Sequence, residues 1–145
     1  THFPIALLIA VVLLEVRNVF RTKLDGEDSI IGWLLWMAVG MTVVAFYSGL
    51  SASDSANQTF VVSDEYISTH FTWGRFLLFA APMTAVLQLA FQRAQFNRGL
   101  FRGLYLSSLI IAMLLALVTG YHGGELVFRH GAGVSATLPI ASPLP

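Results

Sequence analysis

Four histidines are the side chains of this sequence whose type best suits chemistry, because neutral imidazole binds haem iron and other metal ions. They are His2, His70, His122 and His130. The chain has no cysteine, which excludes a disulfide, a thiolate metal site and the Cys-x-x-Cys-His attachment of a c-type haem. The sequence also lacks a phosphate-binding loop, a His-Glu-x-x-His motif and a recognisable Ser-His-Asp arrangement. The chemistry to consider is therefore ligation by imidazole rather than hydrolysis or phosphoryl transfer.

Long apolar segments determine where these histidines can lie. The chain has 145 residues, of which 56% are hydrophobic and 11% charged, and its mean hydropathy is +0.72. The apolar residues form four blocks of membrane-spanning length, at 3–22, 30–50, 64–92 and 100–128. We predict an all-α membrane protein, with residues 1–145 forming one domain, an up-down bundle of four transmembrane helices with a loop at 51–63 and an extended tail at 131–145.

The basic residues predict the orientation of this bundle. Six of them lie in or beside the first and third turns: Arg17, Arg21, Lys23, Arg93, Arg98 and Arg102. Only Arg75 and Arg129 belong to the opposite side. By the positive-inside rule both termini lie on the outer face, which we expect to be the periplasmic face of a bacterial inner membrane. All four histidines then lie at or just beyond the outer ends of helices. The formal net charge of zero does not point to a nucleic-acid partner.

A short repeat selects two of the histidines as a pair. Thr1-His2-Phe3 opens the first helix and Thr69-His70-Phe71 opens the third, so the halves of the chain resemble parallel repeats whose first helices lie diagonally. Imidazoles that face each other across a bundle suit the two axial positions of a b-type haem, whereas zinc needs four ligands around one point. We predict His2 and His70 as ligands of the haem iron. His122 is level with them, and His130 can ligate only if the chain folds back after the glycines at 123–124. The alternative is that these are ordinary interfacial histidines.

Other residues suit a haem but have structural explanations as well. Gly74 can let a macrocycle approach or simply allow helix packing. Arg75 and Arg129 can bind propionates or pair with an acidic neighbour: Asp64, Glu65 or Glu125. Glu15 is the one carboxylate inside an apolar span, and it has either a role with protons or quinone or an interfacial pairing with Arg17.

The chain resembles a bacterial family of small four-helix predicted membrane proteins of unknown function. The resemblance covers the whole chain and is clearest at two segments, His2-Phe3-Pro4-Ile5-Ala6-Leu7 and Gly123-Gly124-Glu125-Leu126-Val127 with His130-Gly131-Ala132-Gly133-Val134. It includes His2, His70 and His130, whereas His122 falls where the family more often has an apolar residue. The resemblance implies association with c-type cytochromes and a layout similar to that of di-haem membrane cytochromes. The second helix has no histidine, so the inner haem of those proteins is expected to be missing.

Together these observations predict an electron-transfer or accessory subunit rather than a stand-alone enzyme. We expect a protein that binds haem b and passes electrons between an outer-face c-type cytochrome or dehydrogenase and the quinone pool, within a hetero-oligomeric membrane complex. The alternative is a non-redox anchor or assembly subunit whose histidines contact a partner, lipids or a surface metal ion.

Overall fold

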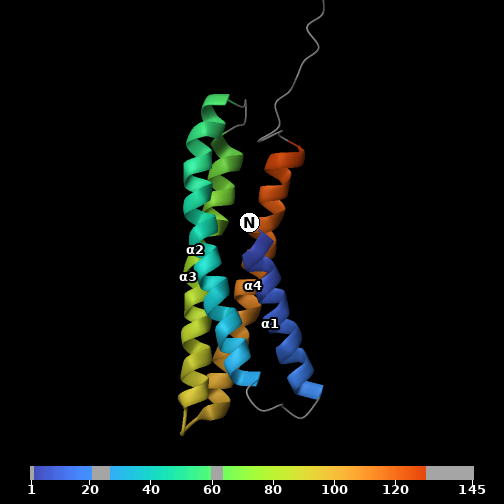
Figure 1. Cartoon of the computed structure of the whole chain (residues 1–145), viewed down its shortest axis with the longest axis vertical. Coiled ribbons are helices and arrows are strands. Elements are labelled where there is room, and N and C mark those ends of the chain that lie inside the picture. Colours follow the sequence, from blue (N-terminus) through green and yellow to red (C-terminus); the bar gives the residue numbers. More distant parts are fainter. Residues whose placement is uncertain (1, 21–26, 60–63, 130–145) are drawn as a thin grey trace, which may run out of the picture.

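Four long helices make up the part of the chain that the computed structural model describes, which is residues 2–20, 27–59 and 64–129. They are α1 (His2–Phe20), α2 (Glu27–Thr59), α3 (Asp64–Arg93) and α4 (Arg98–Phe128), and no strand occurs in these ranges. Each helix is long and apolar enough to cross a membrane. The helices run alternately up and down beside one another (Figure 1). The predicted all-α fold with four transmembrane helices is therefore confirmed.

Helix α2 is longer than the sequence analysis predicted. Residues 51–59 belong to α2, although their polar composition led us to place them in a loop at 51–63. This segment contains neither glycine nor proline, so nothing in it terminates a helix. Two of its serines hydrogen-bond the preceding turn: Ser51 donates to the carbonyl of Tyr47 at 3.3 Å and Ser53 to that of Leu50 at 2.8 Å. The predicted tail at 131–145 lies outside the described residues.

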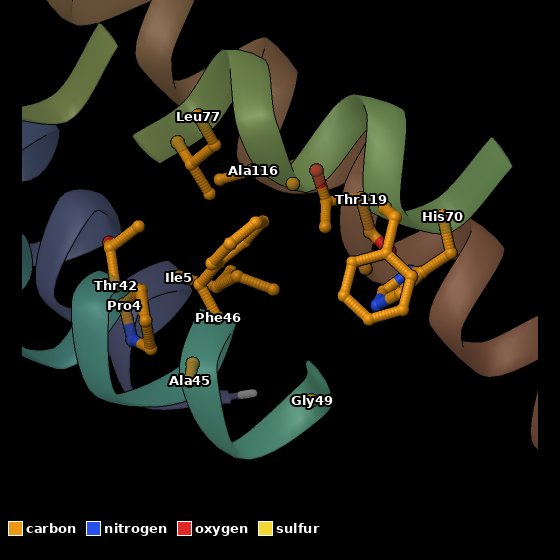
Figure 2. A pocket seen from close by; sticks show the side chains of 13 residues that line it. Pro4, Ile5, Thr42, Ala45, Phe46, Gly49, His70, Leu77, Ala116 and Thr119 are labelled. Atoms are coloured by element: carbon orange, nitrogen blue, oxygen red, sulfur yellow. The ribbon is translucent and has the colours of Figure 1, made fainter. Parts of the chain in front are cut away.

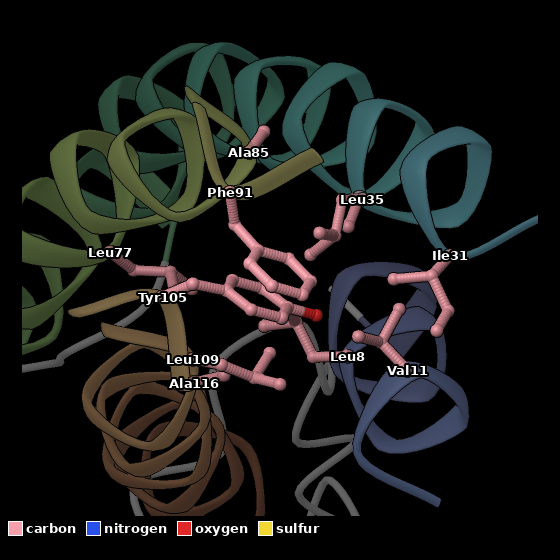
Figure 3. Close-up of a cluster of buried hydrophobic side chains, with 11 residues drawn as sticks. Leu8, Val11, Ile31, Leu35, Leu77, Ala85, Phe91, Tyr105, Leu109 and Ala116 are labelled. Atoms are coloured by element: carbon pink, nitrogen blue, oxygen red, sulfur yellow. The ribbon is translucent and has the colours of Figure 1, made fainter. Parts of the chain in front are cut away.

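Each helix buries one line of side chains, spaced alternately by three and four residues. This spacing places the line on a single face of the helix and is typical of bundles with small crossing angles. The buried lines are Pro4, Leu8, Val11, Glu15 and Asn18 in α1, Ile31, Leu35, Ala38 and Thr42 in α2, Leu77, Ala81, Thr84, Gln88 and Phe91 in α3, and Tyr105, Leu109, Ala112, Ala116 and Thr119 in α4. Figure 3 shows members of these lines meeting in the core. Large apolar side chains on the other faces are exposed, as expected for contact with lipid.

The four helices form a ring in which α1 and α3 lie diagonally. In the described residues α1 packs against α2 and α4, and α3 packs against the same two helices. We call the end where α1 and α3 begin the histidine end, and the opposite end the turn end. With 19 residues α1 is much shorter than the other three helices, which have 33, 30 and 31. Its first residues lie well below the histidine ends of the other helices (Figure 1). Among the described residues, only α2, α3 and α4 therefore reach the far histidine end of the bundle.

Glu15 faces the core near the turn end. Its side chain is 7% exposed and accepts a hydrogen bond from the Tyr105 hydroxyl at 3.0 Å. The Tyr105 ring is 1% exposed and stacks on Phe91, with ring centroids 6.2 Å apart. This hydrogen bond joins α1 to α4 across the lower half of the bundle, where the side chains fill the core.

Candidate functional site

His70 is held on the core face of α3 at the histidine end. It lies seven residues before Leu77 and so continues the buried line of this helix. Its Nδ1 is 3.1 Å from the backbone carbonyl oxygen of Thr119 on α4. Because a carbonyl oxygen can only accept, Nδ1 carries the ring proton and Nε2 is left as an acceptor. Nε2 has no hydrogen-bond partner in the described part of the chain.

A glycine of α4 makes the room for this imidazole. A Cβ atom added at Gly123 would lie 3.0 Å from Cε1 of His70, which is closer than ordinary packing allows. The next residue, Gly124, has nothing within 4 Å of the same position. An added Cβ at Gly74 would lie 3.7 Å from the Phe46 ring, an ordinary contact distance. The close helix approach at this site is therefore set by Gly123, and Gly74 contributes to the wall of the cavity described next.

We expect Gly123→Ala to displace the His70 ring and to lengthen or break its hydrogen bond to Thr119. Gly124→Ala is the matched control, because it adds the same methyl group to the same helix and meets open space. The imidazole ¹⁵N chemical shifts of His70 in detergent or nanodiscs report the tautomer. They should show a single Nδ1-protonated form in the wild type and in Gly124→Ala, and a mixture in Gly123→Ala. Equal spectra for the two variants would contradict this packing.

An apolar cavity adjoins His70 inside the bundle (Figure 2). All four helices contribute to its walls, which are Pro4, Ile5, Thr42, Ala45, Phe46, Gly49, His70, Phe71, Gly74, Leu77, Ala116, Thr119 and Gly120. Figure 2 shows Pro4 and Thr42 on one side and His70 and Thr119 on the other. The cavity has a volume of about 50 Å³, whereas pockets for drug-sized ligands measure roughly 300–1,000 Å³. His70 is the one titratable side chain in its lining.

The other predicted ligands do not line this cavity. His2 is exposed at the start of α1. His122 lies on the flank of α4, where its ring stacks on Trp73 at 6.4 Å and its Nδ1 is 3.7 Å from a carboxylate oxygen of Glu125. His130 lies outside the described residues. No group of three or more histidine, aspartate or glutamate side chains that could hold a metal ion occurs within 2–20, 27–59 and 64–129.

The two arginines considered for propionates also lie outside the cavity. Arg129 pairs with Glu125, with Nη1 2.8 Å from Oε1, so Glu125 is its partner among the acidic neighbours considered above. Arg75 is exposed on α3 and has no ion-pair partner in the described residues. Both remain available to a group bound from outside the bundle, but neither forms part of the site around His70.

Sequence reasoning missed three parts of this arrangement: the Thr119 carbonyl, Gly123 and the pairing of Glu15 with Tyr105. The carbonyl leaves no trace in the sequence, because every residue has one. The spacing of four and three residues from His70 through Gly74 to Leu77 was a usable signal. It places His70 in register with the core of α3, whereas position 2 is out of register with the buried line of α1.

Comparison with known proteins identifies the family and nothing more specific. Neither the curated proteins nor the solved structures yield a match to this chain. The sequence model of one family, described as predicted membrane protein (DUF2231), matches residues 1–136. The matched region includes all four helices and extends beyond the end of α4. The four-helix membrane family inferred from the opening and closing segments is therefore confirmed, and the chain belongs to the DUF2231 family of predicted membrane proteins.

Proposed function

We propose that this protein is a membrane subunit that binds haem b, and that His70 would be one of the residues that hold the haem. The observation that carries the proposal is the geometry of His70. A histidine that ligates a metal usually donates its other ring N–H to a carbonyl or carboxylate, which fixes the tautomer and aims the free nitrogen. His70 has this arrangement, with Nδ1 bonded to Thr119 and Nε2 unprotonated beside an apolar cavity. Zinc is a poorer fit, because it needs about four ligands around one point, and the described residues contain no group of three or more histidine, aspartate or glutamate side chains that could hold a metal ion.

We propose His2 as the second residue that would hold the haem. Pro4 and Ile5 form the wall opposite His70, and His2 precedes them on the same helix (Figure 2). His122 is engaged by Trp73 and lies near Glu125, which makes it the weaker candidate. A porphyrin is larger than the cavity of about 50 Å³, so binding requires the first turn of α1 to move outward. This movement would separate Ile5 from its close contact with α4 at Gly120 and would expose Pro4, which is buried.

The proposed activity is electron transfer between a c-type cytochrome or dehydrogenase at the outer face and the quinone pool. It is supported by the position of His70 at the histidine end, which the positive-inside rule predicts to be the outer end of the bundle. At the turn end Tyr105, Phe91 and Glu15 fill the core. This packing favours one haem rather than the two of di-haem cytochromes.

Introduced cysteines test the orientation on which this proposal depends. Because the chain has no native cysteine, Ser55→Cys and Asp25→Cys each provide one thiol, near the histidine end and in the first turn respectively. In intact cells an impermeant thiol reagent should label Ser55→Cys and leave Asp25→Cys unlabelled until the membrane is opened. The reverse pattern would place His70 at the cytoplasmic face and exclude an outer-face redox partner.

A reduced-minus-oxidised visible spectrum of the protein purified from its native membranes tests haem binding directly. We expect low-spin b-type bands at up to one haem per chain, together with co-purifying redox subunits in mild detergent. Absence of haem from protein purified in this way would reject the proposal and favour an anchor or assembly subunit.

A further inference from the structure

Glu15 is a buried titratable group that the proposed haem function does not use. Among the side chains that the structure describes, it is the only acidic one that is buried. It lies inside the apolar helix α1, five residues before the end at Phe20, which is about 7.5 Å along the helix axis. A carboxylate at this depth costs free energy unless a cation or a proton compensates its charge. The surroundings of Glu15 therefore have to supply one or the other.

The contacts of Glu15 provide one hydrogen bond and no cation. Its Oε1 accepts from the Tyr105 hydroxyl at 3.0 Å, and Figure 3 shows this hydroxyl pointing toward α1. Within the described residues Glu15 has no ion pair, and its Oε2 has no hydrogen-bond partner. No unpartnered side-chain oxygen or nitrogen atom in that part of the chain is fully enclosed, so Oε2 keeps a small exposed surface. The carboxyl group is thus buried as a whole but can be reached at one oxygen.

The charged groups around Glu15 do not replace the missing cation. Helix α1 packs against α2 and α4. From α4 comes the neutral Tyr105, and Arg102, one turn nearer the turn end, forms no ion pair with Glu15. From α2 comes Asp28, which is close enough to interact electrostatically with the Tyr105 hydroxyl and adds a second negative charge. Arg17 follows Glu15 by two residues and is therefore turned away by about 200° around α1.

We propose that Glu15 is a proton-binding site of the membrane domain, which takes up a proton on Oε2 from the turn end and releases it there. The proton comes from water at that end and adds to the carboxylate, without electron transfer or a leaving group. Binding the proton removes the cost of a buried, unpaired charge. A protonated carboxyl can still accept the hydrogen bond on Oε1, so Tyr105 is a positioning residue that leaves Oε2 for the proton. This inference does not depend on haem binding.

The apolar reagent dicyclohexylcarbodiimide tests the proposal, because it adds to carboxyl groups that carry a proton in apolar surroundings. The carboxyl proton passes to a reagent nitrogen and the carboxyl oxygen bonds to the central carbon, so peptide mass spectrometry identifies the labelled residue. In native membrane vesicles with the pH set separately on each face, Glu15 should be labelled. The rate should fall as the pH at the turn-end face rises and should not respond to the pH at the histidine end.

An exposed carboxylate in the same protein serves as the internal control. Asp64 is exposed at the start of α3. It should be labelled at least about tenfold less than Glu15, because its charge is solvated and needs no proton. Glu15→Gln keeps the size of the side chain and an oxygen that accepts from Tyr105, so it should fold like the wild type and lose the label.

Two further measurements distinguish a proton site from a purely structural hydrogen bond. Tyr105→Phe should keep the label and extend it to higher pH, because the lost hydrogen bond favours the carboxylate. A purely structural pair would leave the pH profile unchanged. Infrared difference spectra of wild type minus Glu15→Gln should show the C=O stretch of a protonated acid that disappears as the pH rises.

Three results would overturn the proposal. One is the absence of both the label and the acid band at Glu15 at every pH at which the protein is folded. The others are a labelling rate that does not change with pH and a rate that follows the pH at the histidine-end face.

Discussion

Replacing His70 with alanine is expected to remove the low-spin haem absorption and to lower the haem content of the purified protein about tenfold or more. The variant loses both the proposed ligand nitrogen and the hydrogen bond to Thr119 that orients the ring. Pyridine haemochrome assay and the reduced-minus-oxidised spectrum measure the two effects. Circular dichroism and detergent elution volume should match the wild type, because the change shortens one half-buried side chain and leaves the core below it intact.

Two further histidine variants serve as comparisons that test whether the loss of haem is specific to His70. His122→Ala should keep most of the haem, because that ring lies on the flank of α4 against Trp73. If His2 holds the haem as proposed, His2→Ala should convert the spectrum from low spin to high spin. A full low-spin spectrum in both His70→Ala and His2→Ala would move the ligands to His122, His130 or a partner subunit.

Replacing Tyr105 with alanine is expected to cause the largest loss of stability of any single change in the core. The side chain is 1% exposed, stacks on Phe91 and donates to Glu15. Large-to-small changes at such sites cost about 3–5 kcal/mol. Unfolding in mixed micelles with increasing denaturing detergent measures the free-energy change.

Tyr105→Phe separates the hydrogen bond from the ring. It keeps the stacking on Phe91 but leaves the buried carboxyl of Glu15 without its donor, which should cost about 1–2 kcal/mol. Tyr47→Ala is the surface control, because that side chain is 61% exposed and should have an effect below about 1 kcal/mol. A Tyr105→Ala variant as stable as Tyr47→Ala would show that the Tyr105 contact does not support the bundle.

The sequence predicted the number, type and approximate limits of the helices because these follow from local properties. A run of about twenty apolar residues must satisfy its backbone inside the bilayer as a helix, whatever its neighbours are. The end of α2 was predicted wrongly because polar composition was taken as a sign of a loop. Polar composition indicates where the chain leaves the membrane, but it does not end a helix. A helix-breaking residue such as glycine or proline is needed for that, and residues 51–59 contain neither.

The diagonal arrangement of α1 and α3 was also available from the sequence, through the repeat at Thr1-His2-Phe3 and Thr69-His70-Phe71. The repeat could not show that its two histidines differ in their surroundings. In the tertiary structure His70 lies on the buried line of α3, while His2 lies outside that of α1 and is exposed. This difference depends on the rotation of each helix about its own axis, which packing against the neighbouring helices determines.

That rotation is hard to read in a membrane protein, because lipid-facing residues are as apolar as core residues and no polar face marks the outside. Glu15 shows the same limit: its position in an apolar span was evident, but only packing against Tyr105 placed it in the core. The sequence by itself therefore determined that four helices are long and apolar enough to cross the membrane, and it predicted that the histidines lie at one end of the bundle. Only the tertiary structure decided that His70 alone of the described histidines faces the core, since this requires the close contact of α3 with Thr119 and Gly123 of α4.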